Sequence, residues 1–161
     1  MGKSIDFQEY LEKQTGLQHA DARTYSPLVL AYIGDAIYEL MIRTILVEQN
    51  NCPVQKLHRR ASTLVKASAQ SEMIEKIMPL LTQEEVAVYK RGRNAKSYTK
   101  AKNADLQDYR RATGFEALMG YLYLEKETAR MIDLVCAGLA QMPKESNPRN
   151  RRSVPLSEEE Q

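Results

Sequence analysis

Apolar residues recur every three or four positions along most of this chain, which is the spacing of one face of an α-helix. Polar residues that favour helix starts separate these stretches. Asp6 followed by Glu9 predicts a short first helix, and Ser26 followed by Pro27 predicts a long helix that runs to about residue 48. Further helices are expected over residues 53–69, 71–78, 82–91, from 105 or 108 to about 125, and 126–142.

No stretch alternates apolar and polar residues for long enough to predict a strand, and no repeat of solenoid length is present. We therefore expect an all-α helical bundle. Residues 1–23 are expected to form an N-terminal helix and connector, and residues 24–142 the main folded domain. Residues 143–161 are polar, charged and contain proline, so we expect a disordered tail.

Composition narrows the class of protein. The chain has 161 residues, of which 43% are hydrophobic and 27% charged, as in ordinary soluble globular proteins. No apolar run reaches the roughly 18 residues of a membrane span, and the N-terminus lacks the apolar core of a secretory signal. Cys52 and Cys136 form neither a disulfide framework nor a metal knuckle. We expect a cytoplasmic protein without membrane association.

Basic residues are concentrated in two segments, although the net charge is only +2. The segment Lys90–Lys102 holds six basic residues and no acid, and Lys56–Lys66 holds four more together with His58. Clusters of this kind are candidate phosphate-binding surfaces. The alternative is that they form a solvated loop and a solvated helix face.

The segment "LAYIGDAIYEL", Leu30–Leu40, breaks two local rules inside a helix that is otherwise apolar. Gly34 costs about 1 kcal/mol relative to alanine in a helix interior. The adjacent Asp35 would be an unfavourable charge if it were buried without a partner. Two such faults side by side indicate a functional position.

The segment "FEALMGYLYLE", Phe115–Glu125, has the same character, with Glu116 and Gly120 on one helix face. Close approach of the two helices at Gly34 and Gly120 would bring Asp35 and Glu116 together. Facing carboxylates repel one another, and a divalent cation that prefers oxygen ligands, such as Mg²⁺, removes that repulsion.

The competing interpretation of these acids is structural. Asp35 would then accept hydrogen bonds from tyrosine or arginine side chains within the core. Glu116 would pair with Arg110 or Lys126. The spacing of the residues alone does not decide between these interpretations.

Three segments together resemble the catalytic domain of ribonuclease III. "LAYIGDAIYEL" resembles the signature helix of that domain, "KLHRRASTLVKASAQSEMIEKI" its next helix, and "FEALMGYLYL" its closing helix. Their order and separation match over roughly residues 24–140. No double-stranded-RNA-binding domain follows them in this sequence. With "KRGRNAKS" and "YRRATGFEALMGYLYLEK", this arrangement resembles the short Mini-III ribonucleases.

The chain departs from the larger family at two positions. The resemblance implies four acids per protomer, one located four residues before Asp35 and another three residues before Glu116. Those positions hold Ala31 and Thr113. Water or RNA phosphate oxygens would then complete the metal's ligands, and the nearby acids that could contribute are Glu39, Asp105 and Asp108.

The resemblance implies hydrolysis of phosphodiester bonds in double-stranded RNA, giving 5′-phosphate and 3′-hydroxyl ends. Asp35 and Glu116 would be the catalytic residues and would hold Mg²⁺, with Mn²⁺ as a possible substitute. The expected substrate is ribosomal RNA precursor of the large subunit. The residues expected to bind RNA are Arg91, Arg93, Asn94, Lys96, Lys100, Lys102, Lys56, Arg59 and Arg60, with Gly92 allowing a sharp turn into the basic loop.

The resemblance also implies a homodimer, because one active site cuts one strand of a duplex. The helix that begins at Pro27 is apolar almost all round, so it needs partners on more than one side. We expect Tyr32, Ile33 and Tyr38 to pack at the dimer interface or near the site. The alternative is that this helix is the central helix of a monomeric bundle.

Two other functions compete with the nuclease. A relative without activity would serve as an RNA-binding or ribosome-associated module, for which Ala31 and Thr113 give some support. A helical phosphohydrolase acting on nucleotides would also use clustered acids with Mg²⁺, but several acids would then share one helix. Metal-dependent cleavage separates the nuclease from the binding module.

Overall fold

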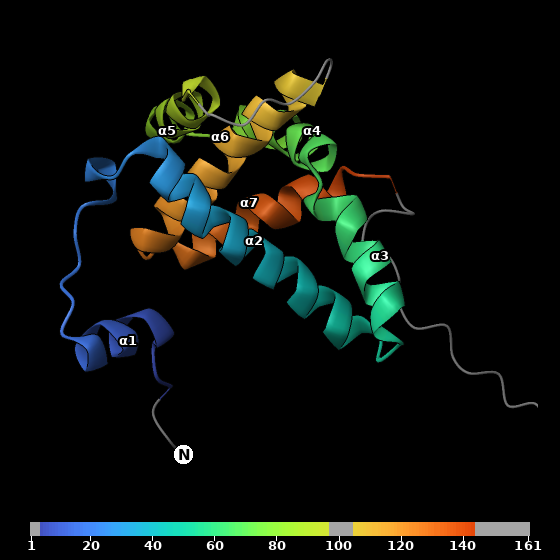
Figure 1. Ribbon diagram of the computed structural model, residues 1–161, viewed down its shortest axis with the longest axis horizontal. Helices are drawn as coiled ribbons and strands as arrows, with labels where there is room; N and C mark the ends of the chain where they lie inside the picture. The colour runs from blue at the N-terminus through green and yellow to red at the C-terminus, as the bar shows by residue number, and fades with distance from the viewer. Residues whose placement is uncertain (1–3, 97–104, 144–161) are drawn as a thin grey trace, which may run out of the picture.

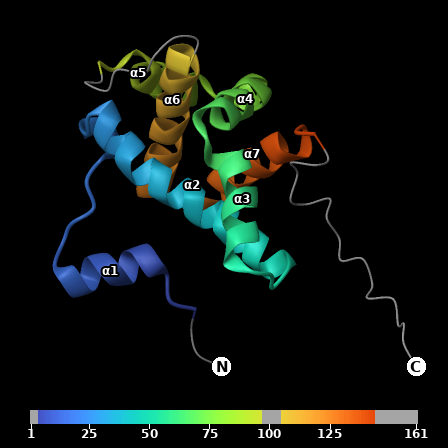
Figure 2. The ribbon, with the colours of Figure 1, turned by 45° about the vertical axis from the view of Figure 1, so that its right-hand side comes forward.

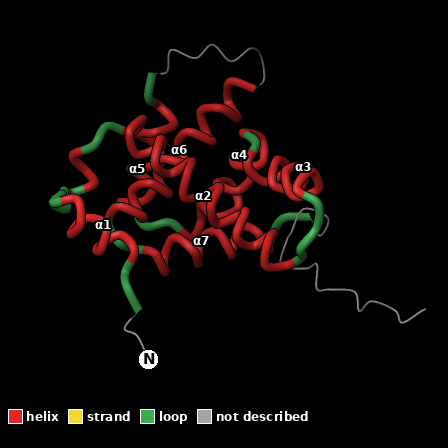
Figure 3. The backbone as a smooth tube through the Cα atoms, turned by 60° about the horizontal axis from the view of Figure 1, so that its bottom comes forward, coloured by secondary structure: helices red, strands yellow, loops and turns green. Residues whose placement is uncertain are grey.

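The structure is a computed structural model that describes residues 4–96 and 105–143, and Figure 3 shows helices and loops throughout these residues. The all-α prediction is therefore confirmed, and none of the described helices is long and apolar enough to cross a membrane. The helices are α1 (Phe7–Thr15), α2 (Pro27–Gln49), α3 (Val54–Val65), α4 (Ala67–Ile77), α5 (Gln83–Asn94), α6 (Asp105–Leu124) and α7 (Thr128–Ala140), with short 3₁₀ turns η1 (Ala22–Thr24) and η2 (Met78–Leu80).

The predicted caps at Asp6 and Ser26 are present, and Thr82 caps the helix expected from residue 82. Each of the three side chains accepts a hydrogen bond from a backbone N–H three residues on. At Thr82 the capping box is complete. Glu85 Oε1 accepts from the Thr82 N–H at 2.8 Å, and Thr82 Oγ1 accepts from the Glu85 N–H at 3.2 Å. Local sequence therefore places the starts of three helices.

Helix α6 lies at the centre of the bundle, with α4 and α5 on either side of it and α2 crossing it (Figures 1 and 2). The ring of Tyr38 in α2 meets the ring of Phe115 in α6 edge to face, with 4.9 Å between the centroids. Both side chains are fully buried, and the Tyr38 hydroxyl donates to the Leu64 carbonyl at 3.0 Å. This core contact joins α2, α3 and α6.

The boundary between α3 and α4 differs from the prediction. A single helix over residues 53–69 was expected. The backbone at Lys66 is extended instead, so α3 ends at Val65 and α4 begins at Ala67. Ser71 is not a helix cap, because it lies inside α4 and is buried. The change of direction allows both Leu64 and Met73 to enter the core.

The basic segment Lys90–Lys102 is also not a loop from its beginning. Helix α5 continues to Asn94, so its first five residues are helical. Gly92 does not start a turn. It packs against α6, where a Cβ at this position would lie 2.7 Å from Ala117 Cβ and 2.9 Å from Gly114 Cα.

The N-terminal helix α1 stands away from the bundle in both views (Figures 1 and 2). An ion pair between Lys126 Nζ and Glu12 Oε2, at 3.1 Å, joins it to the end of α6. The connector is anchored at η1, where the Ala22 N–H donates to Glu125 Oε1 at 2.7 Å. The chain before α2 is therefore held by polar contacts with the α6–α7 turn and by the burial of Ala22 in the core.

Candidate active site

The site is built on direct backbone contact between α2 and α6. A Cβ added at Gly34 would overlap with the carbonyl of Glu116, and a Cβ added at Gly120 would overlap with the carbonyl of Leu30. Only residues without side chains allow this separation. The prediction that the two glycines permit close approach is confirmed.

This crossing places Asp35 and Glu116 in the wall of one open depression of about 600 Å³. Ala31 and Thr113, the positions where the larger family is expected to carry acids, lie in the same wall. The other lining residues come from α2, α4 and α6, and they are Leu28, Tyr32, Ile33, Ala36, Glu39, Ala67, Tyr109 and Ala112. We refer to this feature as the acidic depression.

Both carboxyl groups have a raised pKa. The half-buried Glu116 has a pKa of about 7, first because burial disfavours its charged form and second because Asp35 is negative. The pKa of the more exposed Asp35 is raised by partial burial and then by the charge of Glu39. The acidic depression therefore holds more negative charge than neighbouring positive groups neutralise.

The ion pairs considered for Glu116 do not occur in the described part of the chain. Lys126 pairs with Glu12, and neither Asp35 nor Glu116 forms an ion pair within residues 4–96 and 105–143. Glu39 is different, because Arg43 Nη2 lies 2.7 Å from its Oε1. The two acids are thus the unneutralised pair of the depression.

Carboxylate oxygens suit a hard divalent cation, so the pair fits Mg²⁺ in chemical type. Its donor set is small. Within the described residues no group of three or more His, Cys, Asp or Glu side chains is arranged to hold a metal ion. Glu39 lines the depression, whereas Asp105 and Asp108 do not.

Known proteins resemble the chain over the region that contains these helices. The family model described as Ribonuclease III domain matches residues 28–127, which include Asp35 and Glu116. The Mini-ribonuclease 3 of Clostridium tetani is 53% identical over 116 residues, which cover 71% of this chain and 77% of that protein. The chain belongs to the ribonuclease III family.

Two further known proteins support the same assignment. The Mini-ribonuclease 3 of Thermoanaerobacter sp. is 48% identical over 126 residues, which cover 78% of this chain and 89% of that protein. A crystal structure of a Fusobacterium nucleatum protein is 33% identical with a TM-score of 0.64, covering 71% of this chain and 92% of that one. The Mini-III resemblance is confirmed, and the chain is an endoribonuclease rather than a nucleotide phosphohydrolase.

The first basic segment projects from the end of α5. Arg93 lies over the ring of Tyr89, 5.7 Å from its centroid, and its Nε donates to Asn94 Oδ1 at 3.2 Å. Arg91 Nη2 donates to the Tyr25 carbonyl at 3.3 Å. These contacts orient the two guanidinium groups without neutralising their charge. Lys96 is exposed, and Lys100 and Lys102 lie outside the described residues.

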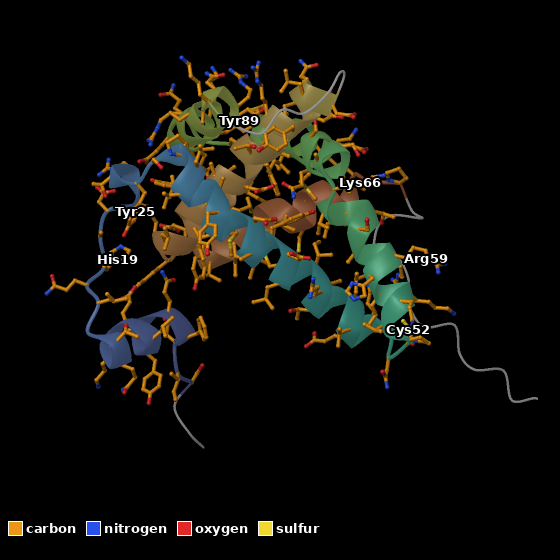
Figure 4. All side chains as sticks on the ribbon, in the orientation of Figure 1. His19, Tyr25, Cys52, Arg59, Lys66 and Tyr89 are labelled. Carbon is orange, nitrogen blue, oxygen red and sulfur yellow. The ribbon has the colours of Figure 1, made fainter. Side chains whose placement is uncertain are left out.

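The second basic segment lies along α3. Figure 4 shows Arg59 on this helix and Lys66 at its junction with α4. Lys56 and Arg59 are exposed, whereas the half-buried Arg60 donates to Gln49 Oε1 at 3.2 Å. Arg60 is therefore partly engaged within the protein.

The three residues expected at an interface or near the site are placed differently from one another. Tyr32 is 82% exposed and lines the acidic depression. Ile33 lines it too and also packs beside Gly120. Tyr38 is fully buried in the core, so it is not available to a second molecule.

Sequence reasoning missed one polar residue behind the acids. Gln70 in α4 is only 2% exposed, its Nε2 donates to the Val65 carbonyl at 2.9 Å, and its side chain partly opposes the rise in the pKa of Glu116. The available signal in the sequence was Gln70 itself, a polar residue between the apolar positions of an amphipathic helix. The segment "KASAQSEM" is, however, also typical of a helix start.

Proposed function

We propose that this ribonuclease cleaves double-stranded RNA in a Mg²⁺-dependent reaction, with Asp35 and Glu116 as the catalytic and metal-binding residues. The observation that carries the proposal is the meeting of two carboxyl groups with raised pKa values in one depression, without a neighbouring cationic side chain among the described residues. A divalent cation supplies the missing positive charge.

When bound, Mg²⁺, or Mn²⁺ in its place, activates water and neutralises the charge that develops on the scissile phosphate. The protein's own residues orient the reaction. Asp35 and Glu116 lie on helices in backbone contact, so the backbone positions from which their side chains project keep a fixed separation. Thr113 and Ala31 leave room beside them for RNA phosphate oxygens and ordered water. The products carry 5′-phosphate and 3′-hydroxyl ends.

The basic segments are the proposed RNA grip. Arg91, Arg93, Asn94 and Lys96 extend from α5, and Lys56, Arg59 and Arg60 lie on α3. Lys100 and Lys102 belong to the same proposal. Double-stranded RNA is recognised mostly through its phosphates and 2′-hydroxyls, which suits cationic and polar side chains.

A homodimer formed through α2 is the proposed working unit. Val29, Tyr32, Leu40 and Val47 are 48%, 82%, 58% and 56% exposed, and they recur at helical spacing along one side of α2. An exposed apolar stripe of this length favours a partner of the same kind. Because Tyr32 also lines the acidic depression, a second copy on this stripe would place the two depressions near each other.

The proposed substrate is ribosomal RNA precursor of the large subunit, and the proposed compartment is the cytoplasm. Both rest on the family and on the basic surface rather than on a specific contact. Residues 1–23, 24–142 and 143–161 remain the proposed N-terminal part, catalytic domain and disordered tail. The tail lies outside the described residues, apart from residue 143.

The deciding experiment incubates the purified protein with long double-stranded RNA and Mg²⁺, beside Asp35→Asn and an EDTA control. We expect cleavage by the wild type with metal only, and end mapping should show 5′-phosphates. Cleavage by Asp35→Asn at the wild-type rate would reject the assigned site. RNA binding without cleavage under all conditions would favour a binding module, with Ala31 and Thr113 as the physical reason.

A further inference from the structure

Thr113 adds a hydroxyl group to the wall of the acidic depression. It lies three residues before Glu116 in α6, so the two side chains share a helix face, and both line the depression together with Asp35. The side chain of Thr113 is half-buried. Ala31, the other position at which the larger family is expected to carry an acid, has no polar side-chain atom. Of these two positions, only Thr113 can therefore form a side-chain hydrogen bond at the site.

The hydrogen-bonding state of this hydroxyl is fixed by its own helix. Thr113 Oγ1 donates to the Tyr109 carbonyl at 3.0 Å. A hydroxyl group has one hydrogen to donate and two lone pairs that accept. Because the hydrogen points to Tyr109, the oxygen can meet a further partner only as an acceptor.

The bond to Tyr109 does not by itself mark a functional site, since threonine hydroxyls inside helices often donate to the carbonyl four residues earlier. Thr15 in α1 does the same, with its Oγ1 2.7 Å from the Leu11 carbonyl oxygen. The difference lies in the surroundings. Thr15 is exposed on a helix that stands away from the bundle (Figure 1), whereas Thr113 lies in the depression that holds two acids.

A divalent cation at the two acids needs acceptors of this kind. Mg²⁺ is commonly bound by one or two carboxylates and keeps several water ligands. Among residues 4–96 and 105–143, no group of three or more His, Cys, Asp or Glu side chains is arranged to hold a metal ion, so water would supply most ligands here. Water ligands donate hydrogen bonds, and acceptors in the surrounding wall hold them in place.

A hydroxyl group accepts these hydrogen bonds without adding charge. Burial and the negative Asp35 already raise the pKa of Glu116 to about 7. A carboxylate at position 113 would add a third negative charge to the depression, whereas threonine provides lone pairs and no charge.

We propose that Thr113 is a positioning residue whose hydroxyl oxygen accepts a hydrogen bond from a water ligand of the divalent cation held by Asp35 and Glu116. This inference rests on the proposed function of the acidic depression. The bond to the Tyr109 carbonyl turns the hydroxyl hydrogen towards the N-terminal end of α6, away from Glu116. The lone pairs of Thr113 then orient the water on the α6 side of the depression, one helical turn from Glu116.

The test compares Thr113→Val, which keeps the shape of the side chain but removes the hydroxyl, with Thr113→Ser, which keeps the hydroxyl. Thr15→Val is the matched control, because it removes a hydroxyl with the same local bond outside the depression. Mn²⁺ binding without RNA is measured by electron paramagnetic resonance, beside thermal unfolding and cleavage kinetics.

We expect Thr113→Val to weaken Mn²⁺ binding about 10-fold and to lower kcat, whereas Thr113→Ser and Thr15→Val stay within about twofold of the wild type. The unfolding temperature of Thr113→Val should stay close to that of the wild type, because the Tyr109 carbonyl keeps its helix hydrogen bond.

Wild-type Mn²⁺ affinity and kcat in Thr113→Val would overturn the inference. Loss of Mn²⁺ binding in Thr113→Ser as large as in Thr113→Val would also overturn it, because the hydroxyl would then not be the group that matters. Asp35→Asn separates this inference from the metal site. If Asp35→Asn binds Mn²⁺ as tightly as the wild type, the proposed metal site fails and the inference fails with it. Loss of binding in Asp35→Asn beside wild-type binding in Thr113→Val would reject Thr113 alone.

Discussion

The backbone carbonyl of Glu116 lies in the space that any side chain at position 34 would fill. Glycine at position 34 is therefore a requirement of the α2–α6 crossing and not merely a tolerated residue. Because Asp35 follows Gly34 directly, the same contact that brings the helices together also sets the separation of the two acids. Packing and chemistry share one geometric constraint.

Gly34→Ala should consequently reduce both stability and activity. We expect a loss of about 1–3 kcal/mol or more in the free energy of unfolding, since the overlapping atoms are backbone and cannot turn away. Urea unfolding and cleavage assays measure the two effects. Gly138→Ala is the matched control, because its added Cβ meets the flexible side chain of Met73. Equal losses in the two variants would contradict this account.

The raised pKa of Glu116 predicts a pH-dependent stability of the metal-free protein. The carboxyl group favours the folded state while it is protonated, so its contribution is full below about 4.5 and is lost as the pH rises through about 7. Glu116→Gln should remove this contribution and be more stable than the wild type at pH 8. Urea unfolding in EDTA at pH 5 and pH 8 tests this, and an unchanged pH dependence in Glu116→Gln would refute it.

Replacing Arg91, Arg93 and Lys96 together by alanine should weaken RNA binding and flatten its salt dependence. Each phosphate contact contributes a slope of roughly 0.9 in a plot of log affinity against log salt for a nucleic-acid duplex. Binding to duplex RNA across a salt series measures the change, with Lys76→Ala on α4 as the control. Unchanged affinity and slope would show that α5 does not grip the RNA.

Leu40→Arg should convert the proposed dimer into monomers. Leu40 is 58% exposed in a single chain, so the charge will cost the isolated fold little but will be buried if two α2 stripes meet. Sedimentation velocity provides the measurement, and Leu17→Arg, 67% exposed beyond α1, is the control. A wild-type monomer at micromolar concentration would rule out the α2 interface.

The sequence alone predicted the features that depend on local rules. Capping residues placed the starts of α1, α2 and α5, because a side-chain acceptor and a backbone donor lie within one turn. Gly34 and Gly120 indicated the helix crossing, because glycine inside an apolar helix is unfavourable unless another backbone packs closely against it. The two acids followed from their position beside these glycines.

The features that could not be predicted from the sequence depend on tertiary contacts. Nothing in the local sequence marks the helix break at Lys66, because neither proline nor glycine is beside it. The break is set by the burial of side chains from α3 before it and from α4 after it. The basic residues at the end of α5 read as a loop, but Gly92 packs on α6 and keeps the helix intact. Gln70 could not be assigned because the carbonyl to which it donates, that of Val65, belongs to another helix.

The edge-to-face contact between Tyr38 and Phe115 has a consequence for heat inactivation. Phe115 directly precedes Glu116, and Tyr38 lies one turn after Asp35, so a contact between two fully buried rings adjoins the acids. Local fluctuations that leave this contact intact cannot separate the acids. Amides around both acids should therefore exchange with solvent only when the whole domain opens, and the enzyme should keep its activity up to the temperature at which it melts.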